Sequence, residues 1–171
     1  MATIRTATPA DATPIAEIVN ALIPTATIEW RYELHSPASM IDWMAVHDCV
    51  LVAEAEGDVV GMGAFGPFRD IVKWPGYRFA VENTIHVRED HWRSGIGRAL
   101  MDALVEEARR IGKHAMIAAI DGANESSIRL HERLGFIEVA RMPEVGAKFG
   151  RWLDLVLMQL QLDSRPDPGE L

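Results

Sequence analysis

Hydrophobic and polar positions along the chain follow two periods, one typical of strands and one typical of helices. Near the N-terminus, a strand-like run around Ile4 is followed by apolar residues at helical spacing: Ile15, Ile18, Val19 and Leu22. Prolines at positions 9 and 14 each follow a threonine, an arrangement typical of a first helical turn. The pattern predicts one short strand and then a helix with a single apolar face.

The next segment of the pattern predicts a helix and three strands. Ser36 and Pro37 open the second helix, because a serine cap followed by proline favours a helix start. Strand-like runs at 50–54 and 59–65 flank the turn sequence Glu56-Gly57-Asp58, which predicts a hairpin. Residues 66–77 contain two prolines and two glycines and predict a loop before a strand at 79–87.

The C-terminal half predicts two more helices among three strands. Leu100, Leu104, Ala108 and Ile111 recur at helical spacing, and Gly112 is expected to end that helix. The apolar run 114–120 predicts a strand buried on both faces. Residues 124–134 predict a helix, and 136–141 and 152–160 predict two strands.

The predicted order is β-α-α-β-β-β-α-β-α-β-β, which indicates one α/β (α+β) domain with helices on the faces of a mixed sheet. We expect the domain to cover residues 1–163. Residues 164–171 are polar and rich in proline, so they are expected to form a flexible tail.

Composition narrows the class of protein. The 171 residues are 49% hydrophobic and 25% charged, with a net charge of −8, which disfavours nucleic-acid partners. The single cysteine, Cys49, excludes a disulfide framework, and six histidines without ligand spacing predict no metal. No apolar run is long enough to span a bilayer and the N-terminus lacks a signal pattern, so we expect a cytoplasmic protein without a membrane partner.

Segment 87–100 carries the strongest chemical signal, because a predicted strand leads through Gly95 and Gly97 directly into a helix. Glycines let the backbone approach a bulky anion, and the helix start offers free N–H donors at the positive end of its dipole. Arg93 and Arg98 add positive charge, so the segment predicts a phosphate-binding loop.

A structural loop that binds no ligand is one alternative. A dinucleotide-binding turn is another: Asp121 lies near the spacing of a ribose-binding acid, but Leu100 occupies the last fingerprint position.

A second element supports an anion-binding role for the glycine loop. Asn124 and His131 are seven residues apart and therefore lie on one helical face, two turns from each other. Separately, asparagine is a common helix cap and a helical histidine usually packs. Together with the loop, segment 124–136 resembles the GNAT acetyltransferase superfamily, whose pyrophosphate loop reads Gln/Arg-x-x-Gly-x-Gly/Ala and whose later helix begins with Asn and ends near Gly-Phe.

Four segments are similar to the phosphinothricin and methionine sulfoximine N-acetyltransferase family: 74–79, 81–85, 127–132 and 145–155. The similarity runs from about residue 4 to residue 163. It implies a GNAT domain with a mostly antiparallel central sheet, and a homodimer to which 145–154 contributes. It also implies acetyl-CoA as cosubstrate and direct attack, in a ternary complex, by the α-amine of a small amino-acid analogue such as phosphinothricin, methionine sulfoximine or methionine sulfone.

The resemblance also implies roles for individual residues. Glu82 is expected to be the base, since burial in an apolar strand raises the pKa of a carboxyl group, and His131 the general acid or thiolate stabiliser. The implied cofactor-binding residues are Ile85, His86, Val87, Arg93, Ser94, Gly95, Ile96, Gly97, Arg98, Asn124 and Ser127. The implied substrate-binding residues are Pro75, Gly76, Tyr77, Arg78 and Glu82. Arg78, with Lys148 or Arg151, is a candidate for the substrate carboxylate, and Glu29-Trp30 for closing the pocket.

Two positions depart from the family pattern. Trp92 replaces the Gln or Arg that opens the pyrophosphate motif, and His86 replaces a tyrosine in the pocket wall. Two other functions remain open: a GNAT enzyme for a different amine, such as a peptide N-terminus or a polyamine, and a non-catalytic acyl-CoA-binding module.

Overall fold

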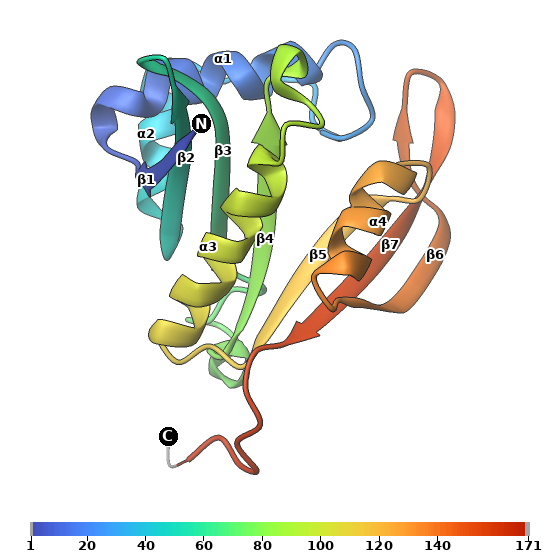
Figure 1. Ribbon diagram of the computed structural model, residues 1–171. Helices are drawn as coiled ribbons and strands as arrows, with labels where there is room; N and C mark the ends of the chain where they lie inside the picture. The colour runs from blue at the N-terminus through green and yellow to red at the C-terminus, as the bar shows by residue number, and fades with distance from the viewer. Residues whose placement is uncertain (1, 170–171) are drawn as a thin grey trace.

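The computed structural model describes residues 2–169, which form a sheet of seven strands with four α-helices around it (Figure 1). The elements follow the predicted order: β1 Thr3–Thr6, α1 Ala12–Leu22, α2 Pro37–Ala45, β2 Cys49–Ala55, β3 Asp58–Pro67, β4 Ala80–Val87, α3 Ile96–Arg110, β5 Ala115–Asp121, α4 Glu125–Arg133, β6 Ile137–Lys148 and β7 Arg151–Gln161. Short 3-10 turns lie at Pro9–Asp11, Pro75–Tyr77 and Glu89–His91.

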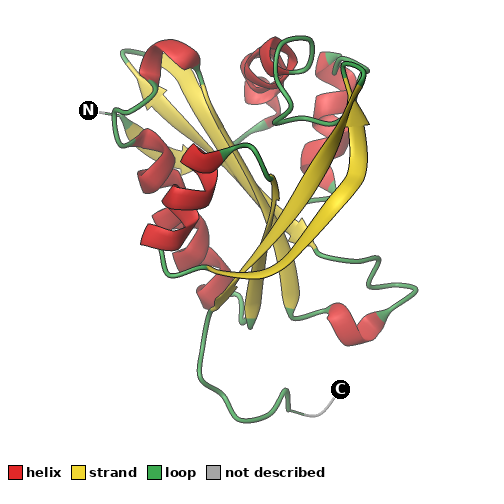
Figure 2. Cartoon of the chain, turned by 90° about the vertical axis from the view of Figure 1, so that its right-hand side faces the viewer, coloured by secondary structure: helices red, strands yellow, loops and turns green. Residues whose placement is uncertain are grey.

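The sheet order is β1-β2-β3-β4-β5-β7-β6, and all neighbours are antiparallel except β4 and β5. The parallel pair is short: it runs from Ala80 opposite Ala115 to Asn83 opposite Ala118. Beyond Asn83 the two strands separate, so they meet at the bottom of Figure 1 and diverge toward its top (Figures 1 and 2). The mixed, mostly antiparallel sheet is confirmed, and the gap between β4 and β5, which we call the splay, organises the site.

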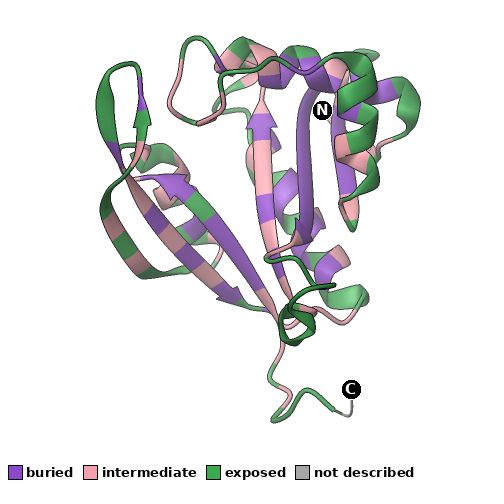
Figure 3. Cartoon of the chain, turned by 180° about the vertical axis from the view of Figure 1, so that it is seen from behind, coloured by how far each residue is buried: buried purple, intermediate pink, exposed green. Residues whose placement is uncertain are grey.

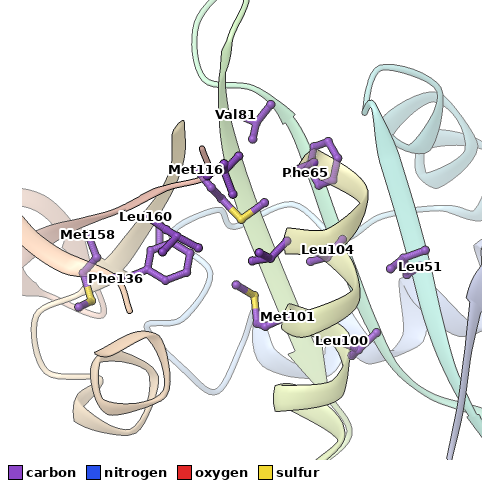
Figure 4. Packing of buried hydrophobic residues seen from close by; sticks show 14 of the residues in the cluster. Leu51, Phe65, Val81, Leu100, Met101, Leu104, Met116, Phe136, Met158 and Leu160 are labelled. Atoms are coloured by element: carbon purple, nitrogen blue, oxygen red, sulfur yellow. The ribbon is translucent and has the colours of Figure 1, made fainter. Parts of the chain in front are cut away.

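Two apolar clusters hold the helices on opposite faces of the sheet. Leu100, Met101 and Leu104 of α3 pack against Phe65 and Val81 on one face (Figure 4). On the other face, residues of α1 and α2 pack with β2 and β3: Ile15, Val19, Met40, Val52 and Met62.

The two faces divide the side chains of β4. His86 lies opposite Met62 in the β3–β4 register, so it shares the face of α1 and α2. Since side chains alternate along a strand, Glu82 and Thr84 lie on this face too, whereas Val81 and Ile85 face α3.

The strand at 136–141 was predicted too short, because β6 continues to Lys148. The extension is mostly exposed (Figure 3) and contains Pro143, so it lacks an alternating apolar pattern. β6 is an edge strand, where a proline removes no necessary ladder hydrogen bond.

In the predicted tail, residues 164–169 form no helix or strand, and Arg165 Nη2 donates to the carbonyl of Gly112 at 2.7 Å. Residues 170–171 lie outside the described residues.

Candidate active site

The splay leaves two backbone amides of β4 without a strand opposite them. Arg88 N donates to Val60 O at 2.9 Å, so even-numbered amides of β4 face β3. The N–H groups of Ile85 and Val87 therefore point into the splay, beyond the last β4–β5 pair at Asn83. Free N–H donors in a strand gap suit an acyl oxygen or an extended amide chain.

A groove of about 720 Å³ continues from the splay to the start of α3. Gly95 is the N-cap residue, with φ of 86° and no side-chain cap, so the first N–H groups of α3 have no capping partner. The groove is lined by the predicted cofactor residues except Ser94: Ile85, His86, Val87, Arg93, Gly95, Ile96, Gly97, Arg98, Asn124 and Ser127. An uncapped helix start beside two arginines fits a pyrophosphate.

Trp92, the departure from the loop motif, lies in the same groove. Its Nε1 donates to the carbonyl of Val87 at 2.7 Å, which ties the loop to the end of β4. About half of the Trp92 residue surface is exposed. The indole thus provides a hydrogen bond that anchors the loop, although it adds no positive charge.

His131 lies on α4 and is 2% exposed in the wall of the splay. Its Nδ1 lies 2.8 Å from the carbonyl of Ser127, so Nδ1 carries the proton. Nε2 then accepts from Asn83 Nδ2 at 3.3 Å. Burial lowers the pKa of His131, and the neutral imidazole offers a lone pair rather than a proton at Nε2.

Glu82 lies in an adjoining pocket of about 420 Å³ on the α2 side of β4. Burial raises the pKa of its carboxyl group, and the positive charge of Arg69 partly offsets that increase. Asn83 and Thr84 line both this pocket and the splay, so the two spaces border the same stretch of β4 where it leaves β5. A carboxyl group with a raised pKa on one side and free backbone amides on the other match the two needs of acyl transfer to an amine, a proton acceptor and donors for the acyl oxygen.

Other expected substrate residues lie elsewhere. Pro75, Gly76, Tyr77 and Arg78 do not line the Glu82 pocket. Tyr77 packs edge-on against Phe68, and the Arg78 guanidinium stacks 4.2 Å above the ring of Phe79. Their substrate role stays a prediction.

Two further charged candidates have structural partners. Lys148 is fully buried and donates to the carbonyls of Ala26 and Glu29, at 2.9 Å for Ala26. Asp121, the acid of the dinucleotide alternative, accepts from Thr27 Oγ1 and from the amide of Ala123. Lys148 and Asp121 therefore fix the 23–36 loop against β6 and β5. Arg151 lies at the exposed start of β7 and does not line the Glu82 pocket.

Sequence reasoning missed Asn83, whose position shows only in the fold. Asn83 is 8% exposed, and its Oδ1 is buried without a hydrogen-bond partner. In the sequence it is a polar residue in an apolar strand, a signal that the neighbouring Glu82 obscured.

Among residues 2–169, no three of His, Cys, Asp and Glu gather in a way that could hold a metal ion. No helix in that range is long and apolar enough to cross a membrane.

Residues 15–136 match the model of the acetyltransferase (GNAT) family. The chain belongs to this family. It is 44% identical to the L-amino acid N-acyltransferase MnaT of Escherichia coli, with 98% of each chain covered. It is also 44% identical to the L-methionine sulfoximine/L-methionine sulfone acetyltransferase of Salmonella typhimurium (97% and 98% covered) and 35% identical to the phosphinothricin N-acetyltransferase of Streptomyces viridochromogenes (96% and 91% covered).

Solved GNAT structures show the same fold. The yncA protein of Salmonella typhimurium, solved with its cofactor acetyl-CoA, superposes with a TM-score of 0.94 at 41% identity, covering 100% of this chain and 99% of that one. The phosphinothricin acetyltransferase of Sinorhizobium meliloti, in complex with acetyl-CoA, gives 0.90 at 34% identity, with 98% and 94% covered. The GNAT identification and the acetyltransferase class are confirmed.

Proposed function

We propose that this enzyme transfers the acetyl group of acetyl-CoA to the α-amine of a small amino-acid analogue of the methionine sulfoximine, methionine sulfone or phosphinothricin type. The names of the relatives support this substrate class. The observation that carries the proposal is the stretch Asn83 and Thr84 of β4, which borders both the Glu82 pocket and the splay. Bound acetyl-CoA would supply an activated acetyl thioester beside these two residues.

The residues divide the work by position. The uncapped start of α3, with Arg93 and Arg98, would hold the phosphates, and the amide of Asn124 the pantetheine arm. The N–H groups of Ile85 and Val87 would bind carbonyl oxygens and stabilise negative charge on the acyl oxygen. Glu82 would bind the substrate ammonium and take its first proton, because the raised pKa of its carboxyl group makes it a better base than an exposed glutamate.

His131 would act as a proton carrier. An amine that starts as an ammonium ion loses two protons on becoming an amide: one goes through Glu82 to water, and the other must reach the departing thiolate. Since Nε2 of His131 carries a lone pair, His131 would take the second proton before delivering it to sulfur. The neutral His131 would thus accept the second amine proton, and the imidazolium that forms would act as the general acid that protonates the thiolate.

A thiol-release assay with acetyl-CoA and a panel of amines tests the proposal. The panel holds the three amino-acid analogues, a peptide N-terminus and a polyamine. We expect release with at least one analogue and a mass increase of one acetyl group on its α-amine. Acetyl-CoA binding without release for any amine would instead support a binding module, and release only with the peptide or polyamine would support the other enzyme alternative.

We propose further that the enzyme is a homodimer. Large apolar side chains are exposed on β6, on β7 and on the turn between them: Ile137, Val139, Val145, Phe149 and Trp152. β6 is an edge strand, so this edge of the sheet combines exposed apolar side chains with unpaired backbone groups. Exposed apolar surface beside an open strand edge favours a protein partner. The cytoplasmic location stays a prediction.

A further inference from the structure

We propose that Glu29 is a specificity-determining residue that selects substrates whose side chain ends in a hydrogen-bond donor and disfavours substrates whose side chain ends in an anion. The inference rests on the proposed function, since it concerns the amine substrate of the same pocket. Glu29 lies in the 23–36 loop and, like Glu82, lines the pocket of about 420 Å³.

Two anchors hold Glu29 in place. Its Oε1 lies 2.9 Å from Nε2 of His86, whose side chain is only 4% exposed. Its backbone carbonyl accepts from the buried Nζ of Lys148. Because His86 and Lys148 come from β4 and β6, the loop residue is fixed from two elements, and its carboxylate cannot simply swing into solvent.

Glu29 lines the pocket and keeps part of its side chain accessible. The Glu29 side chain is 24% exposed, and the bond to His86 engages only Oε1. Burial raises the pKa of Glu29, but the hydrogen bond with His86 and the neighbouring Arg31 outweigh it and hold the pKa below its usual value, so Glu29 is ionised near neutral pH. One carboxylate oxygen therefore remains as an acceptor with a negative charge.

The lining of the pocket contains no lysine or arginine to balance the two carboxylates. His47 also lines it, but burial lowers the pKa of His47 and its Nδ1 is bonded to the carbonyl of Trp43. Arg69 and Arg31 act on Glu82 and Glu29 from outside the lining. A second anion at the end of the substrate side chain, in addition to the α-carboxylate that all three analogues share, would thus lose water while facing negative groups, which is unfavourable.

The positions along β4 indicate what Glu29 would contact. Glu82, Thr84 and His86 lie on one face, about 7 Å apart for each pair of alternate residues. If the substrate ammonium binds Glu82, a side chain that extends past Thr84 approaches the carboxylate held at His86. The end of that side chain is where the three analogues differ: a sulfoximine presents an N–H donor, a sulfone only acceptor oxygens, and a phosphinate a negative charge.

The test compares kcat and KM of the full chain for L-methionine sulfoximine, L-methionine sulfone and L-phosphinothricin at saturating acetyl-CoA. The variants are Glu29→Gln and the control Glu33→Gln, which removes the same charge from an exposed position of the same loop. We expect wild type and Glu33→Gln to prefer the sulfoximine, with phosphinothricin the poorest substrate. In Glu29→Gln, the sulfoximine-to-sulfone ratio of kcat/KM should fall about 10-fold, mainly through KM, because a charged acceptor is lost. The kcat/KM for phosphinothricin should rise.

Each other result overturns the inference. Unchanged selectivity in a Glu29→Gln protein with wild-type Tm would show that the carboxylate does not face the substrate. An equal loss of kcat for all three substrates would show a catalytic role instead. If wild type acetylates none of the three, the proposed function fails and this inference fails with it. Glu29→Asp, which keeps the charge but shortens the side chain, provides a second variant if Glu29→Gln does not fold.

Discussion

The side-chain amide of Asn83 and the imidazole of His131 are hydrogen-bonded across the splay, with 3.3 Å between Nδ2 and Nε2. The two residues come from β4 and α4, which the chain separates by 48 positions. The carbonyl of Ser127 keeps the proton of His131 on Nδ1, and the Asn83 amide contacts the remaining lone pair at Nε2, beside the stretch of β4 that borders both pockets.

Asn83→Asp should raise the pKa of His131, because a carboxylate beside Nε2 stabilises the imidazolium where the amide stabilises the neutral ring. The measurement is an NMR titration of the His131 side-chain nitrogens. Ser126→Asp adds the same charge at an exposed position of α4 and should change this pKa much less. Equal shifts in both variants would mean that overall charge, and not the direct contact, controls His131.

Glu82→Gln should lower kcat/KM by about 100-fold or more, which is the usual contribution of a positioned base. In wild type, kcat/KM should fall as the pH drops through the raised pKa of Glu82, since protonation removes the base. Glu82→Gln should lose this dependence and retain only the dependences of the substrate amine and of His131, whose pKa burial lowers. A pH–rate profile checks both statements, with Glu106→Gln on the exposed side of α3 as the control. An intact acidic limb in Glu82→Gln would assign it to another group.

Gly146→Ala should destabilise the fold, because a Cβ at this position would overlap the ring of Trp30. Overpacking of this kind costs about 1–3 kcal/mol in the free energy of unfolding. Gly76→Ala is the matched control: a Cβ there has nothing within 4 Å. Urea denaturation of both variants gives the comparison. If Gly146→Ala unfolds like wild type, Trp30 has room to move, and the 23–36 loop is less firmly held than its contacts indicate.

Trp152→Asp should convert the proposed dimer into a monomer, since it places a charge among the exposed apolar side chains at the β6–β7 edge of the sheet. Val72→Asp introduces the same charge at a valine that is 93% exposed outside that edge, and should leave the dimer intact. Light scattering coupled to size-exclusion chromatography measures both masses. A monomeric wild-type protein would contradict the proposal directly.

The sequence predicted those positions of the candidate site that depend on a few consecutive residues, and it could not predict contacts between residues far apart in the chain. Gly95 and Gly97 lie at a strand–helix junction, and their local pattern was enough to predict that position; their part in phosphate binding stays a prediction. The contact of Glu29 with His86 joins residues 57 positions apart, and nothing in either local pattern specifies it. Lys148 shows the opposite case: it was expected to meet a substrate carboxylate, but burial turns it to the backbone carbonyls of a loop.

The same distinction applies to the fold. Elements with one buried face, such as α3, were predicted because burial on one side produces a helical period. The second half of β6 was not, since an edge strand exposed on both faces has no such constraint on its composition.

Because β4 separates from β5, hydrogen exchange at the backbone amides of β4 should report whether the cofactor is bound. The amides of Ile85 and Val87 have no strand opposite them, so their hydrogens should exchange rapidly with deuterium in the free protein, unlike neighbours that bond to β3. A bound pantetheine arm would take the place of the missing strand. Acetyl-CoA should therefore slow exchange at these two amides selectively, and mass spectrometry of the 80–87 peptide would read occupancy without any chemical turnover.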